Sequence, residues 1–352
     1  MDRTHYLGLD AHARSCDLAA MSAAGRVSKR WHLATSIPAL VEAIESVPGP
    51  RKLTLEEGPM ADWLMRALSP HVDELVVCDP RRNNLIGKDQ DKTDPIDAGT
   101  LADLYRGGYL RAVHHPADES RELFKRHVAL YHDRVAQRVR EANKVLGLLR
   151  RYGIVHKAAA LDEQETRQAI LKELLAGGQR RLAWEDARLL LESYDLARDH
   201  QERARRTLVK LARKVEIIRR WAKIPGIKWI RASTLYVYLD TPERFRSKSA
   251  LWKYMGIGLV KKTSGAGPVV LRPGARYNRA LKDTILGAAI ATVRREDSPF
   301  RKQYQRLLSE GHPKRIARRT VARTLAAVVW GMWKHGGEYD PGKIGMPRKK
   351  PR

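Results

Sequence analysis

The placement of proline divides this 352-residue chain into parts with different sequence patterns. No proline occurs between Pro116 and Pro225, and this interval carries long charged segments with apolar residues at helical spacing. Because proline interrupts helices, an interval without it can form helices of many turns. Before it, short apolar runs alternate with helical patterns. The chain therefore predicts an α/β domain followed by a mainly helical part.

The N-terminal hundred residues predict three strands, then alternating helices and strands. Ala24-Gly25 marks a turn between the second and third strands, and Pro38 marks a helix start. This is the order of the ribonuclease H-like fold. The expected strands are 6–10, 16–21, 26–33, 52–55 and 75–78, and a helix is expected at 60–68 between the last two strands.

Two long helices are expected at 119–152 and 182–221, with a shorter one at 163–175 between them. Their apolar positions recur at spacings of three, four or seven, which predicts an antiparallel coiled-coil arm. The predicted seam consists of Leu123, Leu130, Val135, Val139, Leu146 and Leu149 on the first helix and Leu189, Tyr194, Leu208, Leu211, Val215 and Ile218 on the second.

The charge is distributed unevenly along the chain. Residues 1–110 hold 13 Lys and Arg against 16 Asp and Glu, whereas residues 111–352 hold 54 against 24, a net charge of +30. A basic body of this size is typical of proteins that bind nucleic acid, although on the arm a solvated helical face would explain the arginines equally well. The candidate phosphate contacts are Arg134, Arg138, Lys261, Lys262, Arg276, Arg318 and Arg319.

Carboxylates gather in the acidic part of the chain. Asp10 ends a strand expected to be buried, Glu56 and Glu57 end another, and Asp94 and Asp97 lie three residues apart at a predicted helix start. Converging carboxylates repel one another unless a divalent cation neutralises them, so this layout is typical of metal-dependent phosphodiester chemistry.

Each of these acids also has a purely structural explanation. Asp94 before Pro95 is a good helix N-cap, and an acid at Asp97 completes something close to a capping box. Asp10 could simply form a turn. Alternation along a strand places Glu56 and Glu57 on opposite faces, so only one of them can join Asp10.

Cysteine and hydropathy patterns exclude several classes of protein. Cys16 and Cys78 are isolated, which predicts two buried thiols rather than a disulfide framework or a zinc site. No uninterrupted apolar stretch reaches about 18 residues, and no signal pattern precedes the first strand, so we expect a cytoplasmic protein. The turn 224–227 and the glycine-rich run 256–267 are not specific, because glycines in such segments most often serve turn geometry.

An ordered set of motifs resembles the transposases of the insertion sequence 110 family. The motifs cover most of the chain and are Gly8-Leu9-Asp10-Ala11-His12, Glu56-Glu57-Gly58-Pro59, Lys92-Thr93-Asp94-Pro95-Ile96-Asp97-Ala98, Ile224-Pro225-Gly226-Ile227, Phe245-Arg246-Ser247 and Tyr254-Met255-Gly256-Ile257-Gly258-Leu259-Val260.

This resemblance implies a RuvC-like catalytic domain at 1–115, a helical arm at 116–222, a C-terminal transposase domain at 223–340 and a basic tail at 341–352. It implies a metal-binding tetrad and a catalytic serine, Ser264, which stands in Thr263-Ser264-Gly265-Ala266 where the family usually has Ser-Ser-Gly-Gly. Gly58-Pro59 after the acidic pair favours Glu56 over Glu57. The implied tetrad is Asp10, Glu56, Asp94 and Asp97.

The implied cofactor is Mg²⁺ or Mn²⁺, and the implied partners are donor DNA, target DNA and a noncoding bridge RNA that pairs with both. We also expect a homo-oligomer, dimer or tetramer, associated with the nucleoid and not with a membrane. Two alternatives remain open at this point: a RuvC-like endonuclease that cuts branched DNA by water attack, and a non-catalytic protein that binds RNA or DNA.

Overall fold

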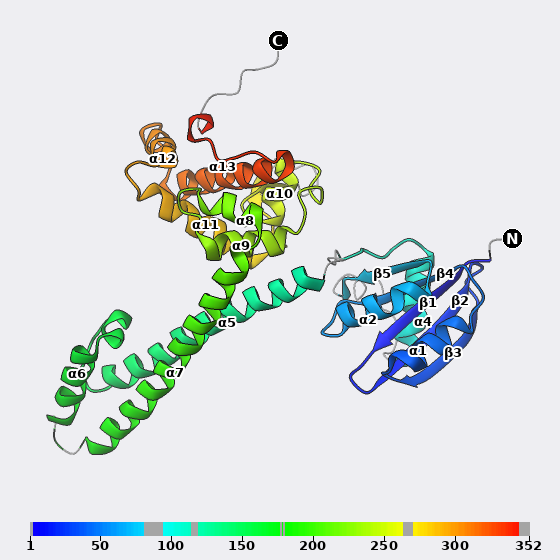
Figure 1. The fold of residues 1–352 in the computed structure, drawn as a ribbon, viewed down its shortest axis with the longest axis horizontal. Coiled ribbons are helices and arrows are strands. Elements are labelled where there is room, and N and C mark those ends of the chain that lie inside the picture. Colours follow the sequence, from blue (N-terminus) through cyan, green and yellow to red (C-terminus); the bar gives the residue numbers. More distant parts are fainter. Residues whose placement is uncertain are drawn as a thin grey trace, which may run out of the picture. The chain divides into compact units, whose positions relative to one another are not determined.

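The chain divides into two compact units, Met1–Ala117 and Asp118–Arg352, and each is described by itself (Figure 1). For residues 94–97, 261–262 and 270–273 only the backbone is described. The computed structural model describes residues 3–80, 94–113, 119–176, 178, 180–262 and 270–344.

Unit 1 is built on a five-stranded sheet in the order β3-β2-β1-β4-β5. β2 runs antiparallel to both of its neighbours, whereas β4 runs parallel to β1 and to β5. This mixed sheet fits the predicted α/β domain and the predicted order of strands. The strands are β1 (His5–Ala11), β2 (Ser15–Ser22), β3 (Val27–Ala34), β4 (Arg51–Glu56) and β5 (Glu74–Cys78).

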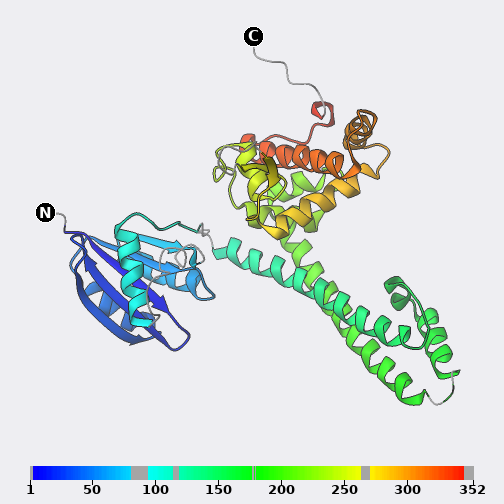
Figure 2. The same cartoon turned by 180° about the vertical axis from the view of Figure 1, so that it is seen from behind.

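Helices cover both faces of this sheet. α1 (Ile37–Glu45) and α2 (Ala61–Leu68) lie over one face, seen in front in Figure 1, and α4 (Asp94–Arg106) crosses the other face, seen in front in Figure 2. The main core of unit 1 lies under α1 and α2 and contains Leu7, Leu9, Leu53, Leu55, Leu40, Ile44, Leu64 and Leu68, each at most 1% exposed.

Both cysteines are free and buried, as the sequence predicts. Cys16 belongs to the apolar core of unit 1, and the thiol of Cys78 lies 3.4 Å from the carbonyl oxygen of Leu55. Among the described residues, no helix is long and apolar enough to cross a membrane.

Unit 2 begins with an arm of two long helices, α5 (Glu119–Arg150) and α7 (Arg181–Ala212), which pack against each other. They run antiparallel, because His127 near the start of α5 contacts Ala204 near the end of α7 and Arg138 contacts Tyr194. The turn η2 (Ala158–Asp162) and the helix α6 (Gln164–Ala176) join them at the far end of the arm (Figure 1).

The second long helix is shorter than predicted. α7 ends at Ala212, Val215 is extended with φ −95° and ψ 117°, and a new helix, α8 (Glu216–Ala222), follows. The break allows Trp221 to be buried in the C-terminal core, where its indole N–H donates to the carbonyl oxygen of Val329 at 3.1 Å. Tertiary burial therefore overrides a continuous helical pattern here.

The predicted seam of the arm is partly wrong. Leu146, Leu149, Tyr194 and Leu208 are buried, but the proximal half of α5 buries Phe124 and Val128, and alanines fill much of the inner face of α7. Small residues let the two backbones approach, so the larger predicted residues turn outward. The exposed ones are Leu123, Leu130, Val139 and Leu189, at 44–62%.

The remainder of unit 2 is a helical body with one small hairpin. Its core contains Trp221, Leu235, Leu251, Phe300 and Leu325. Its elements are α8, α9 (Trp229–Leu239), α10 (Lys248–Tyr254), β6 (Leu259–Lys262), β7 (Val270–Pro273), α11 (Arg279–Val293), α12 (Pro299–Ser309) and α13 (Lys314–His335).

Candidate functional site

Two of the predicted acids stand side by side at the carboxyl ends of parallel strands. Leu9 of β1 pairs with Leu55 of β4, and Asp10 and Glu56 are the residues that follow them. Neighbouring strands lie about 4.8 Å apart. The strand pairing therefore brings two carboxylates that are 46 positions apart in the sequence to the same edge of the sheet.

The two acids also share a face of the sheet. Side chains alternate along a strand, and Leu9 and Leu55 point into the core beneath α1 and α2. Asp10 and Glu56 therefore lie on the opposite face, which α4 covers. Glu57 lies beyond the end of β4, is exposed, and donates its backbone N–H to the carbonyl oxygen of Cys78 at 2.8 Å.

Gly8 allows α4 to approach this face closely. A Cβ atom on Gly8 would lie 2.0 Å from the carbonyl oxygen of Ala98 and 2.7 Å from the backbone nitrogen of Ala102. Backbone atoms cannot move aside as flexible side chains can, so any larger residue at position 8 would push the helix away from the sheet.

The direction of α4 carries its first turn toward Asp10. Tyr6 on β1 meets Tyr105 of α4 with ring centroids 5.7 Å apart, and Gly8 meets Ala98. As β1 proceeds toward Asp10, α4 therefore runs back toward its start at Asp94. Two strand residues span about 6.7 Å and four helical residues about 6 Å, so the backbone of the first turn, which includes Asp94 and Asp97, reaches the strand end that holds Asp10.

Two of the described carboxylates at this edge have histidine neighbours. Asp10 lies 3.2 Å from Nε2 of His12, and its side chain is 20% exposed. Asp17, which the sequence analysis did not single out, pairs directly with Asp10 across β1 and β2 and accepts from Nδ1 of His32 at 3.0 Å. An acid within an otherwise apolar strand was the signal that could have drawn attention to Asp17.

Metal binding requires more carboxylates than the described side chains supply. Among those side chains, no group of three or more His, Cys, Asp or Glu converges closely enough to hold a metal ion. Asp10 and Glu56 nevertheless fit a hard divalent cation chemically, since both present carboxylate oxygens at one strand edge. The side chains of Asp94 and Asp97 are not among those described, although their backbone belongs to α4.

The predicted nucleophile belongs to the connection between two paired strands of unit 2. β6 and β7 form an antiparallel hairpin in which Lys262 pairs with Val270. Ser264 lies between them, outside the described residues. Lys261 and Lys262 belong to β6, and nothing is described of their side chains.

The glycine-rich turn before this hairpin is held by internal hydrogen bonds. Gly256 has φ +66°, and its backbone N–H donates to the carbonyl oxygen of Lys253 at 3.1 Å. The N–H groups of Ile257 and Gly258 both donate to the carbonyl oxygen of Trp252. These three donors serve the turn itself, in agreement with the structural explanation of this motif.

Three further predicted basic residues are wholly or partly accessible. Arg276 and Arg318 are exposed, and Arg319 is partly buried. None of the three side chains has a hydrogen bond or ion pair to another residue in the described part of the chain, so their charge is available to a ligand.

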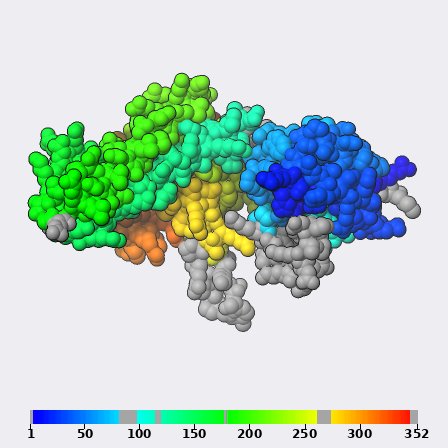
Figure 3. Space-filling model, turned by 90° about the horizontal axis from the view of Figure 1, so that it is seen from below, coloured from blue at the N-terminus to red at the C-terminus, as the bar shows by residue number. Residues whose placement is uncertain are grey.

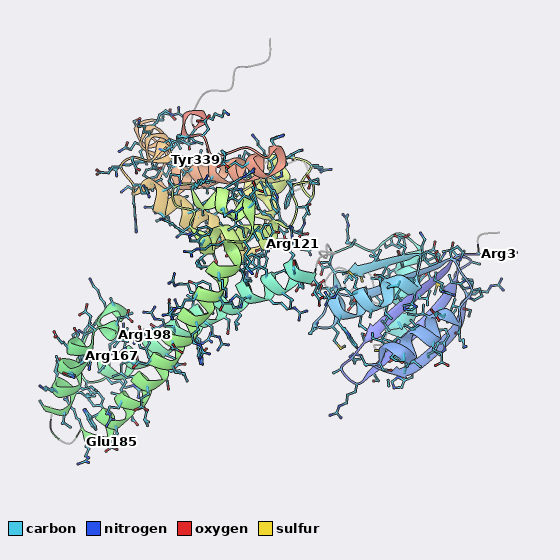
Figure 4. All side chains as sticks on the ribbon, in the orientation of Figure 1. Arg3, Arg121, Arg167, Glu185, Arg198 and Tyr339 are labelled. Atoms are coloured by element: carbon cyan, nitrogen blue, oxygen red, sulfur yellow. The ribbon has the colours of Figure 1, made fainter. Side chains whose placement is uncertain are left out.

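Arginines in the distal half of the arm, near α6, serve packing. Arg138 donates to Asp162 at 2.7 Å and 2.9 Å and to the hydroxyl of Tyr194, while Arg167 makes a bidentate contact with Asp195 at 2.8 Å. Figure 4 shows Arg167 in this part of the arm beside Arg198. Burial opposes ionisation of Asp162, but hydrogen bonding by Tyr194 and the charge of Arg138 outweigh it and lower the pKa of that carboxyl group.

The proximal half of the arm, near α9, carries more basic charge than its acids neutralise. Glu202 is shared by Arg205 and Arg206, whose hydrogen bonds lower its pKa to about 2. Lys210 and Arg213 have no acidic partner among the described residues. Figure 3 shows α7 as an exposed green ridge beside α5.

A hollow of about 490 Å³ lies along the junction of α5 and α7 in this proximal half. Arg134 lines it and is partly engaged by Asp133 at 2.8 Å and by Gln137 at 2.8 Å. His127 and Leu130 of α5 and His200, Arg203 and Thr207 of α7 complete most of its wall.

Comparison with known proteins identifies two matching family models. Residues 7–154 match a DEDD-type model of IS110 elements described as a transposase. Residues 218–305 match a model described as the transposase IS116/IS110/IS902 family. Together these models span about two thirds of the chain. No curated protein matches the sequence.

Proposed function

The chain belongs to the IS110 family of transposases, and we propose that it cuts and rejoins the DNA strands of an insertion sequence with a carboxylate tetrad and a serine nucleophile. It is a DNA transposase, so DNA is its substrate, and its DEDD-type domain implies dependence on a divalent cation. The observation that carries the proposal is the parallel strand pairing that brings Asp10 and Glu56 to one edge of the sheet, together with the close approach of α4 to β1 at Gly8.

In this proposal unit 1 is a RuvC-like domain, and Asp10, Glu56, Asp94 and Asp97 hold Mg²⁺ or a similar ion. The sheet order and the helices on both faces support this assignment. A bound cation would polarise the scissile phosphodiester and stabilise charge on the departing oxygen. The four acids would hold that cation, and the close approach of α4 to β1 at Gly8 supports this placement.

Ser264 is the proposed nucleophile. Its Oγ forms a bond to phosphorus while the bond from phosphorus to the departing deoxyribose oxygen breaks, and the serine proton is transferred to that oxygen. Attack by a second strand reverses these changes and regenerates the serine. The number of phosphodiester bonds is conserved, so the exchange requires neither water nor a nucleoside triphosphate.

Bridge RNA guidance is part of the same proposal. If base pairing reads sequence, the protein needs mainly to hold backbones, which suits a net charge of +30 on residues 111–352. We assign such contacts to Arg134, Lys261, Lys262, Arg276, Arg318 and Arg319. Arg138 was the seventh candidate, and its contacts with Asp162 and Tyr194 favour a packing role.

A homo-oligomer, dimer or tetramer, completes the proposal, because exchange of several strands requires more than one active site. The arm offers a surface for it. Leu182, Leu189 and Leu196 recur at intervals of seven along α7 and are 71%, 62% and 58% exposed. A heptad stripe of this kind favours pairing with another helix.

A covalent-trapping experiment tests the proposal. Full-length protein is mixed with Mg²⁺, the RNA transcribed from the element and a labelled duplex that contains the element's end, and denaturing gels then detect DNA linked to protein. We expect an adduct with the wild type and none with Ser264→Ala or Asp10→Asn. Hydrolytic cutting that survives in Ser264→Ala would instead identify a water-using nuclease, and a lack of any cation-dependent cleavage would identify a binding protein.

A further inference from the structure

α13 concentrates basic residues where a helix accommodates them least well. Lys314–His335 contains no Asp or Glu, and its first ten residues include Lys314, Arg315, Arg318, Arg319 and Arg323. The N-terminal end of a helix carries the positive end of its dipole, which disfavours the cations of the first turn, Lys314 and Arg315. In the described part of the chain, Arg315, Arg318 and Arg319 have no ion pair.

Arg323 is the partly buried member of this group and is held in a fixed position. Its Nε donates to the carbonyl oxygen of Ile257 at 2.8 Å, and Trp252 donates its indole N–H to the backbone carbonyl of Arg323 at 3.1 Å. The guanidinium carbon also lies 5.9 Å from the Trp252 ring centroid. Burial, and then repulsion by Arg319, lower the pKa of Arg323. Its two terminal nitrogens have no partner among the described residues.

The surrounding sequence offers no anion to neutralise Arg323. Between Glu243 and Asp283 the chain contains no carboxylate, and this interval includes α10, both strands of the hairpin and Ser264. It contributes further cations instead, among them Lys261, Lys262 and Arg276. The compensating negative charge must therefore come from another part of the chain or from a bound ligand.

We propose that Arg315, Arg318, Arg319 and Arg323, here called the α13 basic face, bind consecutive backbone phosphates of the DNA strand that is cut, with Arg323 as the contact nearest the scissile position. Its Nε is fixed to Ile257, two residues before β6, so its terminal nitrogens lie near the base of the hairpin that carries Ser264. A guanidinium fork matches phosphate oxygens bidentately. The identity of the strand rests on the proposed function.

Arg323→Gln tests this assignment, because glutamine retains a donor for Ile257 but carries no charge. Binding of the full-length protein to a duplex containing the element's end is measured over a range of salt concentrations. Losing one phosphate contact reduces the slope of log K against log salt by about 0.9 and weakens binding on the order of tenfold at low salt. The adduct yield should fall in parallel.

The matched control is Arg306→Gln on α12, whose cation is already paired with Glu310 at 3.5 Å. It removes the same charge, and its salt slope should equal that of the wild type. If Arg323→Gln lowers the melting temperature, Arg318→Gln and Arg319→Gln replace it, since neither side chain has a described partner whose loss would disturb folding. Their combined slope should fall by about two.

An unchanged salt slope in both the Arg323 variant and the Arg318/Arg319 variant would overturn the proposal. So would a loss confined to binding of the element's RNA, measured separately on RNA alone. These outcomes do not depend on the serine chemistry. If the wild type forms no serine-linked adduct, the proposed function fails, while the salt slopes still decide whether the α13 basic face contacts DNA.

Discussion

At the scale of single residues, Gly8 determines whether the candidate site can assemble. Because Gly8 has no side chain, α4 can pack directly against the backbone of β1. A Cβ atom at position 8 would lie 2.0 Å from the carbonyl oxygen of Ala98. The glycine two positions before Asp10 is therefore required by packing, and its effect on the acids is indirect. It sets how near the first turn of α4 comes to Asp10 and Glu56.

His132 gives unit 2 a pH-dependent stability. Its Nε2 lies 2.9 Å from Oγ1 of Thr234, and that hydroxyl donates to the carbonyl oxygen of Ile230, so it accepts from the histidine. Burial lowers the pKa of His132 below its usual value of 6.5. Below about pH 6.5 the unfolded chain binds a proton that the folded chain does not yet bind. The free energy of unfolding therefore decreases as the pH is lowered, by up to about 1.4 kcal/mol per pH unit.

Urea denaturation at pH 7.5, 6.5 and 5.5 checks this expectation against His132→Gln. Glutamine retains a donor toward Thr234 but does not titrate, so the variant should lose less stability than the wild type between pH 7.5 and pH 5.5. Equal pH slopes in the two proteins would contradict it. The comparison cancels contributions from the other histidines, which are identical in both.

At the scale of elements, the arm divides into two halves that use arginine differently. In the distal half Arg138, Arg167 and Arg198 neutralise Asp162 and Asp195 across the gap between α5, η2, α6 and α7. In the proximal half Lys210 and Arg213 face solvent, and no described acid is paired with them. Equal numbers of cations on a helix therefore do not imply equal affinity for nucleic acid.

This division predicts opposite results from two substitutions. Lys210→Glu together with Arg213→Glu should weaken binding to the element's RNA or DNA and flatten its salt dependence, because each reversal removes a cation available to phosphate. Arg138→Gln should leave the salt slope unchanged and destabilise the distal arm by about 1 kcal/mol, because it removes charged hydrogen bonds at partly exposed positions. Salt titrations and urea denaturation measure the two effects, and a flattened slope in Arg138→Gln would refute the division.

At the scale of the whole molecule, the two units have separate cores and opposite charge. The core beneath α1 and α2 belongs to unit 1, whereas the core around Trp221 belongs to unit 2. Ligands that bind one unit should therefore stabilise that unit selectively. The acidic unit is the one expected to take cations, and the basic unit is the one expected to take nucleic acid.

Magnesium should slow hydrogen exchange in peptides of β1 and β4 without affecting peptides of α13. A ligand at one hundred times its Kd stabilises the state that binds it by about 2.7 kcal/mol. Asp10→Asn should abolish this protection, whereas Asp103→Asn, at an exposed position paired with Arg106 late in α4, should retain it. Protection that persists in Asp10→Asn, measured by mass spectrometry, would remove Asp10 from the metal site.

Much of the fold follows from local signals in the sequence. Alternating apolar residues identified the strands of unit 1, a proline-free interval identified the long helices, and the position of Asp10 and Glu56 after apolar runs placed both at strand ends. Motif order also indicated the transposase family. These features depend on neighbouring residues along the chain, so they can be predicted without knowledge of the tertiary structure.

Only the tertiary structure decided which surfaces meet. It buried Phe124 in place of Leu123, ended α7 at Ala212 so that Trp221 could enter the core, and gave Arg138 partners that no spacing rule predicts. It also joined Arg323 to Ile257 across 66 positions. Such contacts depend on the packing of residues that are far apart in sequence. A periodic pattern identifies which residues are apolar, but it does not identify the residues against which they pack.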